Sequence, residues 1–239
     1  MPSSQGNKNV ATPKTAPRST LQASRKHGAA VDHVFEIIRQ GIISGRFVPG
    51  QRLVLRDLQE EIGFSRSTFR EAFRRLASEK LVNLVPNRGV AVQRLTRNEL
   101  ADLFQIRETL EGLAARLAAE RIDEGDNRRK FIAVCKKLKA DTTPERTTYI
   151  EQNQLFHATI VEISGNTRLP ELLGQMQIPI LMSQWRQMMT RSDIEMSIQE
   201  HETIIEAIVG GRPDKADAAM RRHLHRAAKR TIAYLSGAS

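Results

Sequence analysis

Three histidines fall on the inward faces of segments whose apolar residues recur at helical spacing. His201 lies within a run of isoleucines at steps of three and four, so its side chain must point into a core. His157 shares a helix face with Phe156, and His223 follows Met220 at helical spacing. Neutral imidazole is a preferred ligand of zinc and nickel. The three side chains could therefore converge on a divalent metal, and the alternative is that each is a hydrogen-bonded core residue.

An oxygen donor stands near one of these histidines. Asn153 precedes His157 by one helical turn and could complete a set of four ligands. Three histidines with an open position would also permit a metal-dependent hydrolase, because zinc lowers the pKa of its bound water. Such an enzyme needs a general base, and the acids that flank His201, Glu200 and Glu202, should point elsewhere. We therefore expect a binding site and do not expect an enzyme.

Arginines form a second pattern, four residues apart at Arg66, Arg70 and Arg74. On a helix these positions share one face, away from the apolar stripe that contains Phe69 and Phe73. At the start of a helix that enters the major groove, arginine can bond guanine O6 and N7, while hydroxyls and backbone N–H groups hold phosphates. The candidate DNA contacts are Arg56, Ser65, Arg66, Ser67, Thr68, Arg70, Arg88 and Gly89. The alternative is a row of arginines on a solvated helix face.

A winged helix-turn-helix over residues 29–95 would position these candidate DNA contacts. Its expected elements are helices over Val31–Ser44 and Leu55–Ile62, a third helix capped by Ser65, and strands over Leu81–Val85 and Val90–Leu95. Gly63 provides the sharp turn before the third helix. The turn between the strands would carry Arg88 and Gly89 at the tip of a wing. The predicted domain thus has three helices and a two-stranded wing.

Residues 96–236 read as an all-α antiparallel helical bundle, which makes the whole fold mainly α. Thr96 and Glu99 match a capping box at the start of a helix that runs to about Arg121. Its expected core stripe is Leu103, Ile106, Leu110, Leu113 and Leu117. Further helices are expected over about 126–140, 144–163, 169–190, 193–209 and 213–235. Pro179 should kink or break the fourth of the helices in this domain.

Basic charge is concentrated in the first part of the chain. The formal net charge is +10, and residues 1–98 carry all of it, because the remaining residues hold twenty Lys or Arg and twenty Asp or Glu. This asymmetry is expected when one domain meets a polyanion such as double-stranded DNA. Residues 1–28 carry five basic residues and no acid, and we expect a disordered basic arm that either attracts phosphates or is merely solvated.

The cellular setting follows from what the sequence lacks. The single cysteine, Cys135, excludes an internal disulfide framework and fits a reducing compartment. No apolar run approaches the roughly 20 residues of a spanning helix, and the N-terminal segment lacks the apolar core of a secretory signal. We therefore expect a cytoplasmic protein of about two domains with no membrane partner.

Several motifs resemble one known family. PGQRL, LRDLQEEIGFSRSTFREAFRRLASEKLV and PNRGVAV look like the DNA-binding domain of GntR-family bacterial transcription regulators over about residues 30–95. Ser67-Thr68-Phe69 stands where many members have Thr-Pro-Val, a change that a helix tolerates because that proline sits in its first turn. LFQIRETLEGLAARLAAERI, NQLFHATIVEISGN and EHETIIEAIVGGRPDKADAAMRRHL are similar to the FCD domain that defines the FadR subgroup.

The resemblance implies an all-helical domain that binds a small effector, commonly an organic acid, and in many members a metal held by one aspartate and three histidines. By motif the histidines are His157, His201 and His223, and Asn153 occupies the aspartate position. An amide oxygen is a weaker ligand than a carboxylate, so metal affinity should fall or the site should serve the effector without metal. Arg107 matches an arginine near the family's pocket and could pair with a carboxylate. A surface salt bridge between Arg107 and Glu111 is the alternative.

These observations predict a ligand-responsive transcriptional repressor that binds a palindromic operator as a homodimer. A two-fold dimer would place two reading heads on two half-sites. A small carboxylate effector in the helical domain would change operator affinity by binding one dimer geometry better than the other. The alternative is a metal-sensing regulator, in which metal alone changes operator binding.

Overall fold

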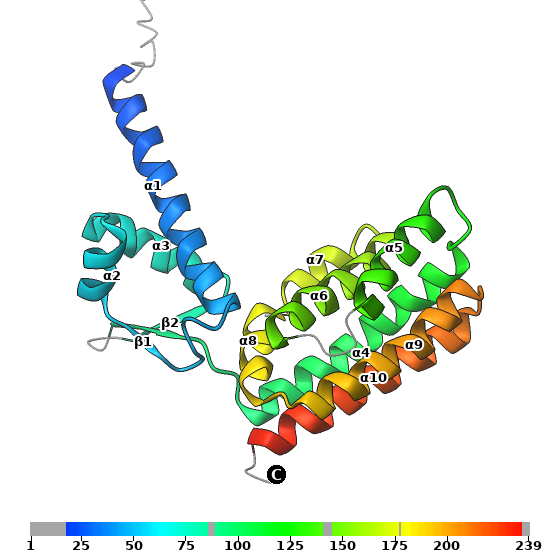
Figure 1. Cartoon of the computed structure of the whole chain (residues 1–239). Coiled ribbons are helices and arrows are strands. Elements are labelled where there is room, and N and C mark those ends of the chain that lie inside the picture. The colour runs from blue at the N-terminus through cyan, green and yellow to red at the C-terminus, as the bar shows by residue number, and fades with distance from the viewer. Residues whose placement is uncertain (1–17, 86–88, 141–144, 177, 236–239) are drawn as a thin grey trace, which may run out of the picture.

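The structure, a computed structural model, describes residues 18–85, 89–140, 145–176 and 178–235. Two domains follow one another along the chain (Figure 1). The first combines three helices with a small sheet, and in the residues described the second is built from helices alone. The fold is mainly α, as the sequence predicts.

The first domain is a winged helix-turn-helix. Its elements are α1 (Arg18–Ile43), β1 (Arg52–Leu53), α2 (Leu55–Ile62), α3 (Arg66–Ser78), β2 (Val82–Val85) and β3 (Gly89–Val92). α2 has the predicted bounds and ends at Gly63, whose φ of 83° a residue with a Cβ rarely adopts. Ser65 then caps α3 by accepting a hydrogen bond from the Thr68 backbone N–H at 3.2 Å, which confirms the predicted cap.

The wing belongs to a three-stranded antiparallel sheet with the order β1-β3-β2. β2 and β3 form the predicted hairpin, with pairs from Val82–Val92 to Val85–Gly89. β1 pairs with the other edge of β3, so the expected two-stranded wing is wrong by one strand. A strand of two residues is too short to show an alternating pattern. The turn residue Arg88 lies outside the described residues.

Helix α1 is longer than the sequence predicts. It begins at Arg18 instead of Val31, so residues 18–28 are helical, and the prediction of a disordered arm over 1–28 is wrong for them. Residues 1–17 lie outside the described part of the chain. Val31 lies in the hydrophobic core, and the earliest turns of α1 project away from the domain (Figure 1).

The second domain is an antiparallel bundle. Its described helices are α4 (Arg97–Glu120), α5 (Asn127–Ala140), α6 (Arg146–Ile163), α7 (Leu169–Gly174), α8 (Ile178–Met188), α9 (Arg191–Val209) and α10 (Pro213–Leu235). The capping box at the start of α4 is present, with Thr96 and Glu99 each accepting a hydrogen bond from the other's backbone N–H. The helix expected over 169–190 is divided into α7 and α8, and Pro179 lies in the first turn of α8.

The predicted core stripe of α4 is wrong. Ile106 and Leu113 are 45% and 38% exposed, although the sequence places them in the core. The buried face instead combines two large apolar residues with an ion pair and five small residues: Leu100, Phe104, Arg107, Glu111, Gly112, Ala114, Ala115, Ala118 and Ala119. α10 packs along this face, where small alanine side chains let two helices approach closely (Figure 1). The leucine stripe is therefore only partly buried: Leu103 and Leu110 pack against the core, whereas Ile106 and Leu113 are exposed.

Helix α8 joins the two domains. The Gln184 side chain makes two buried hydrogen bonds to the Leu95 backbone in the linker, of 3.0 Å from its N–H and 2.9 Å to its carbonyl. Arg186 donates to the Ser44 carbonyl, just past the end of α1, at 3.0 Å. Gly45, the next residue, has a φ of +81°. A Cβ added to Gly45 would lie only 3.2 Å from Cδ of Arg186. α8 therefore fixes both the linker and the end of α1.

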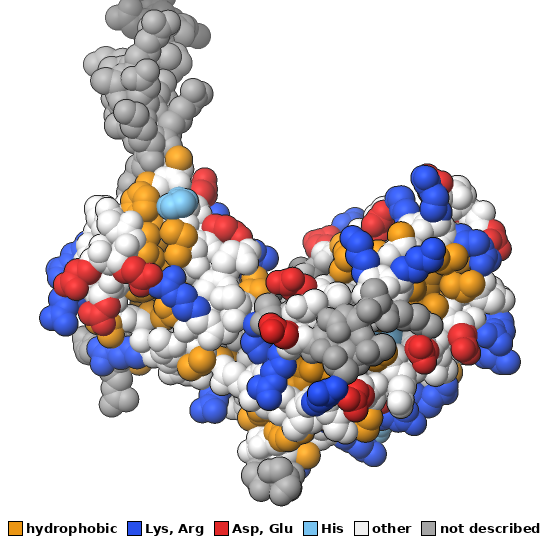
Figure 2. All heavy atoms as spheres, in the orientation of Figure 1, with side chains coloured by type: hydrophobic (Ala, Val, Ile, Leu, Met, Phe, Trp, Pro, Cys, Tyr) orange, Lys and Arg blue, Asp and Glu red, His pale blue; other side chains and the backbone are white. Residues whose placement is uncertain are grey.

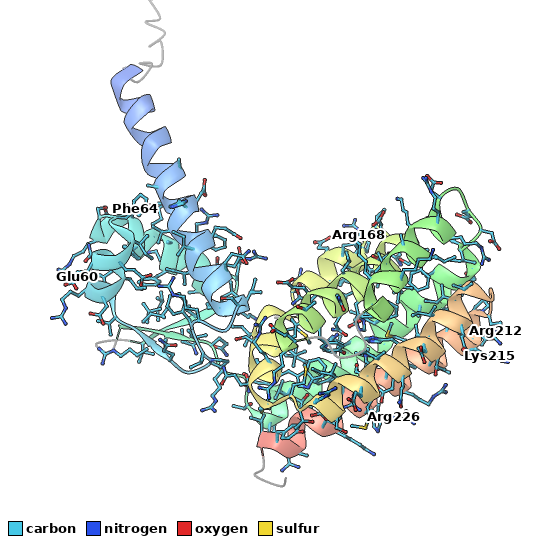
Figure 3. All side chains as sticks on the ribbon, in the orientation of Figure 1. Glu60, Phe64, Arg168, Arg212, Lys215 and Arg226 are labelled. Atoms are coloured by element: carbon cyan, nitrogen blue, oxygen red, sulfur yellow. The ribbon has the colours of Figure 1, made fainter. Side chains whose placement is uncertain are left out.

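Charged side chains cover the outside of the bundle with both signs interspersed (Figure 2). Arg212, Lys215 and Arg226 point away from the domain at and along α10 (Figure 3). This mixture fits the zero net charge of residues 99–239. Among the described residues, no helix combines the length and the apolar character that a membrane span needs.

Candidate functional site

The three predicted histidines meet inside the bundle. His157 lies on α6, His201 on α9 and His223 on α10, and one ring nitrogen from each lies within 4.8 Å of the others. The ring centroids are 5.6 Å apart for His157 and His201 and 4.6 Å apart for His201 and His223. His201 and His223 are buried, and His157 is partly buried. The convergence predicted from periodicity on three separate helices is confirmed.

A buried ion pair orients His157. Glu111 accepts a hydrogen bond from Nε of Arg107 at 2.7 Å, and its other oxygen lies 2.6 Å from Nδ1 of His157. The side chains of Arg107 and Glu111 are only 4% and 3% exposed, so the surface salt bridge considered from the sequence is in fact buried. With Nδ1 donating to a carboxylate, Nε2 of His157 keeps the lone pair that a metal would bind.

His223 has a matching partner. Its Nδ1 lies 2.8 Å from a carboxylate oxygen of Glu200 on α9. Arg230 donates to both oxygens of that carboxylate, at 3.2 Å and 3.3 Å. The same arrangement of arginine, glutamate and histidine thus occurs twice in the cluster. Carboxylates that accept from Nδ1 fix the ring orientation of histidines that bind metals.

The charges in this cluster are set by burial and by these pairs. Burial raises the pKa of Glu111, but Arg107 and His157 outweigh it and hold the pKa well below its usual range. Burial likewise opposes the ionised form of Glu200, yet bonds from His223 and Arg230 bring its pKa to about 2. Burial lowers the pKa of His223 to about 4 despite its bond with Glu200. Near neutral pH the carboxylates are charged and the imidazole of His223 is neutral, the form that binds metal.

His201 is the central member of the cluster. It is fully buried, and neither of its ring nitrogens has a hydrogen-bond partner among the described residues. Burial, with the nearby His223 and His157, holds its pKa well below the ordinary value. An unsatisfied buried polar group costs about 1–3 kcal/mol. A divalent metal would occupy a nitrogen of His201 that otherwise lacks a partner, so the residues present fit such an ion.

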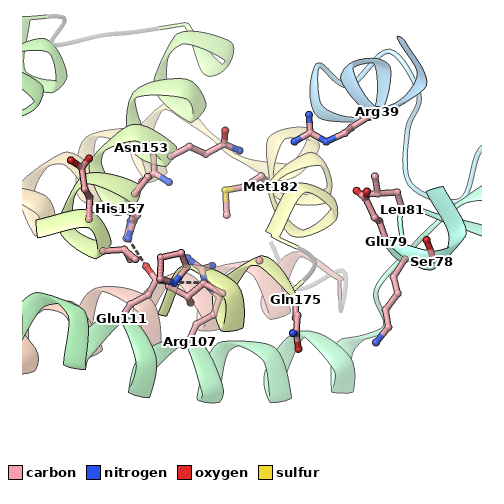
Figure 4. Close-up of a pocket in the computed structure, with 18 residues that line it drawn as sticks. Arg39, Ser78, Glu79, Leu81, Arg107, Glu111, Asn153, His157, Gln175 and Met182 are labelled. Carbon is pink, nitrogen blue, oxygen red and sulfur yellow. Dashed lines mark hydrogen bonds and ion pairs between the residues drawn. The ribbon is translucent and has the colours of Figure 1, made fainter. Parts of the chain in front are cut away.

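A cavity of about 860 Å³ reaches the cluster from one side. Arg107, Glu111, Asn153 and His157 line one end of it (Figure 4). Its volume lies within the range of about 300–1,000 Å³ that is common for small-molecule sites. Both residues predicted to touch an effector, Arg107 and Asn153, therefore lie on the wall of one cavity beside a candidate metal ligand.

Asn153 lies one turn from His157, as the sequence places it. It is 4% exposed, and its side-chain oxygen accepts a hydrogen bond from the Tyr149 hydroxyl at 3.3 Å. The Tyr149 hydroxyl also lies 2.6 Å from the Ser197 hydroxyl. The candidate donors are therefore three imidazoles and one amide oxygen, and none of them is an anion. Such a set would leave the charge of a bound divalent ion uncompensated.

The arginine row of α3 is on the surface. Arg66, Arg70 and Arg74 are exposed, and no ion pair joins them to any residue in the described ranges. Arg56 at the start of α2 is 81% exposed and has only long contacts, of 3.5 Å and 3.9 Å, with acids on its own helix. These side chains are accessible to a DNA duplex.

The polar residues at the start of α3 differ in their surroundings. Ser65 and Ser67 are exposed, and their hydroxyls lie 2.8 Å apart. Thr68 is buried, 3% exposed, and its hydroxyl bonds Ser65 at 2.8 Å. Thr68 therefore supports the cap of α3, and its side chain is unsuited to the predicted DNA contact. Gly89 is exposed at the start of β3, with a φ of +87°.

Two residues of the site were missed from the sequence. Glu200 was expected to point away from the cluster, but it bonds His223. Glu111 was considered only as a surface partner of Arg107, yet it bonds His157. The available signal was the spacing of Arg107 and Glu111, four residues apart on a helix face that is otherwise rich in alanine. An ion pair on such a face is expected to be buried.

Comparison with known proteins agrees with this architecture. Residues 30–92 match the family model "Bacterial regulatory proteins, gntR family", and residues 102–226 match the FCD domain. The chain is 30% identical over 208 residues to the Uxu operon regulator of Haemophilus influenzae, covering 79% of this chain and 77% of that protein. It is 27% identical to the "probable D-xylose utilization operon transcriptional repressor" of Paenarthrobacter nicotinovorans, over 80% and 84% of the two chains.

A solved structure shares the fold. A GntR protein from Rhodococcus sp. RHA1 superposes with a TM-score of 0.71 at 25% identity, covering 88% of this chain and 99% of that one. The two family models together span both domains described above. The chain therefore belongs to the GntR family of bacterial regulatory proteins and is a DNA-binding transcriptional regulator with a C-terminal FCD domain.

Proposed function

We propose that this regulator is a repressor that binds a palindromic operator as a homodimer and responds to a small organic acid held beside a divalent metal. The observation that carries the proposal is His201, which is fully buried beside two other histidines and whose ring nitrogens have no hydrogen-bond partner among the described residues. A core that kept such a residue without a ligand would lose stability. A relative named as a repressor supports the direction of control.

The metal would be held by His157, His201 and His223, with zinc or nickel as the candidates. When bound, it would supply a positive charge that attracts a carboxylate. The protein's own part is to orient the imidazoles of His157 and His223 through Glu111 and Glu200, while burial keeps His201 and His223 neutral. Because Asn153 adds no negative charge, the site should bind metal less tightly than one with an aspartate there and should favour an anionic effector. Arg107 would pair with the acid at the cavity wall.

The same geometry argues for binding and against hydrolysis. Glu111 and Glu200, the carboxylates that touch the histidines, are both bonded to arginines. Their lowered pKa values make them weak proton acceptors, and a general base works best with a pKa near the operating pH. A metal-sensing regulator is the second candidate, favoured by His201, whose ring nitrogens have no partner in the described part of the chain. Titration of the DNA complex with zinc or nickel alone distinguishes acid sensing from metal sensing. If the protein senses an acid, metal alone should leave its affinity for the operator unchanged.

The acid-sensing proposal can be tested by thermal-shift screening of the purified protein against organic acids, with and without zinc or nickel. We expect a carboxylate to raise the melting temperature more when metal is present, because ligands that bind only the native state stabilise it. A screen in which no acid shifts the melting temperature under either condition would contradict the proposed effector class.

The DNA-binding face would consist of Arg56, Ser65, Arg66, Ser67, Arg70, Arg88 and Gly89. Replacing Arg66 by alanine should relax the base preference at one position of each half-site and cost about 1–3 kcal/mol there, because arginine at the start of a recognition helix reads guanine. Duplexes selected from a random pool by the wild-type and variant proteins give the measurement. Arg74→Ala, on the same face but farther from the helix start, is the matched control and should keep the preference. An unchanged preference in Arg66→Ala would remove it from the reading set.

The outer stripe of α4 is the proposed dimer contact. Leu103, Ile106, Leu110, Leu113 and Leu117 alternate at steps of three and four, the spacing of a coiled-coil seam, and lie partly or largely exposed. A second copy of this chain could cover the seam. Ile106→Glu with Leu113→Glu should give a monomer in sedimentation experiments and weaken operator binding by at least tenfold, because the second half-site contact is no longer intramolecular. Leu155→Glu, at a similarly exposed position on α6, should remain dimeric. A dimeric seam variant would contradict the assignment.

A further inference from the structure

The cavity is not confined to the effector domain. Its far wall is formed by the DNA-binding domain, through Arg39 of α1 and residues 78–81, which end α3 and lead into β2 (Figure 4). We propose that the cavity binds an acid with two anionic groups, one at Arg107 and the histidine cluster and the other at Arg39 and Lys80. This inference rests on the proposed acid effector and extends it, because the ligand would touch both domains at once.

Lys80 occupies an unusual backbone position. Its φ is 55°, and it is the one non-glycine residue with positive φ in the ranges that the structure describes. The backbone N–H of Lys80 donates to Ala77, and that of Leu81 donates to Leu76, at 3.0 Å and 2.9 Å. This pair of bonds forms a Schellman motif, in which the left-handed position is usually glycine. A lysine at this position costs backbone stability, so a role for its side chain would explain its presence.

The ends of the cavity are polar and its middle is apolar. Leu81, Leu173 and Met182 contribute to the walls, and Met182 lies between the two ends in Figure 4. At the far end the cations Arg39 and Lys80 face one acid, Glu79, while Arg39 also contacts Glu36 on its own helix at 3.1 Å. Arg39 and Lys80 thus place two cationic side chains at that end of the cavity. A linear diacid whose carboxylates are separated by methylene groups matches this distribution.

The position of Lys80 gives a ligand direct access to the reading elements. Lys80 lies between α3, which carries the candidate DNA-reading arginines, and β2, the first strand of the wing hairpin. On the other side, Met182 lies on α8, the helix that also holds the linker through Gln184 and the end of α1 through Arg186. A ligand seated between Lys80 and Met182 would favour one arrangement of the domains, which is what a change in DNA affinity requires.

The test compares diacids with monoacids of equal length. Adipate and suberate, with hexanoate and octanoate as partners, are titrated into the full-length protein with nickel present. The chain's single tryptophan, Trp185, is buried on α8 and provides the fluorescence readout. We expect the wild-type protein to bind at least one diacid about tenfold more tightly than its monoacid partner, as one added charge-assisted bond would allow. Lys80→Gln and Arg39→Gln should reduce this ratio to near one, and Lys137→Gln, exposed on α5, should keep it.

Lys80→Gly is the control for misfolding. Glycine suits the positive φ at this position, so this variant should have a higher melting temperature than the wild type. Its preference for the diacid over the monoacid should nevertheless fall. A ratio near one in the wild-type protein, or an unchanged ratio in Lys80→Gln and Lys80→Gly, would overturn the two-ended site and leave the acid effector standing. Failure of every acid to bind, with or without nickel, would overturn the acid effector and the two-ended site together.

Discussion

Replacing Glu111 by alanine should lower the free energy of unfolding by about 3–5 kcal/mol, because it removes one partner of a buried ion pair. Arg107 would keep its charge at 4% exposure with no acceptor, and Nδ1 of His157 would lose its carboxylate. Urea denaturation followed by circular dichroism at neutral pH gives the measurement. The loss should exceed what removal of a surface acid causes, since the cost comes from the uncompensated guanidinium rather than from the carboxylate alone.

The matched control is Glu120→Ala on the same helix. Glu120 pairs with Arg116 four residues earlier, as Glu111 does with Arg107, but both side chains of that pair are over 40% exposed. An exposed pair contributes about 0–1 kcal/mol, so this variant should be nearly neutral. The double variant Arg107→Met with Glu111→Leu should recover much of the lost stability, because replacing both charges leaves none unpaired. Equal effects of Glu111→Ala and Glu120→Ala would mean that the buried pair does not hold the bundle.

The contribution of Glu111 also has a defined pH dependence. Its folded-state pKa lies well below the ordinary value, so the unfolded chain binds its proton first as the pH falls. The stabilisation is therefore fully present above the unfolded pKa of about 4.3 and declines below it. The difference in unfolding free energy between the wild type and Glu111→Gln should shrink in the same acidic range.

The sequence predicts best those features that depend on neighbouring residues. The bounds of α2, the turn at Gly63 and the Ser65 cap all follow from interactions within a few residues, and the structure confirms them. The convergence of the three histidines also follows, because each lies in an apolar stripe that can face only the core. Local chemistry and helical periodicity are sufficient for these features.

Features that depend on distant partners were not predictable in the same way. α4 has two apolar faces, and the leucine face looks like the core, but the alanine face is the one that admits α10. Because α10 packs against the alanine face, Ile106 and Leu113 are exposed, although the sequence predicts that they are buried. The contact between Glu200 and His223 joins two helices, so no spacing within one helix could reveal it. β1 forms because it pairs with a free edge of β3. Its two residues are too few to show an alternating pattern in the sequence.

Replacing His201 by leucine should stabilise the metal-free protein by about 1–3 kcal/mol, because it removes two buried ring nitrogens that have no partner among the described residues. The same change should abolish the response to metal. For the wild type, nickel or zinc at about 100 times its dissociation constant should add about 2.7 kcal/mol to the free energy of unfolding. Denaturation curves with and without metal measure both effects on one sample.

The control is His225→Leu, at an exposed position on α10 that is remote from the cluster in its contacts: its ring lies 3.4 Å from Glu108. That variant should keep the full metal response and leave the metal-free stability nearly unchanged, since an exposed pair contributes little. The two effects of His201→Leu must have opposite signs: the metal-free protein gains stability, and the stabilisation by metal is lost. Simple damage to the core cannot produce both. A His201→Leu protein that is destabilised without metal, or that still responds to metal, would show that His201 is a satisfied core residue and not a ligand.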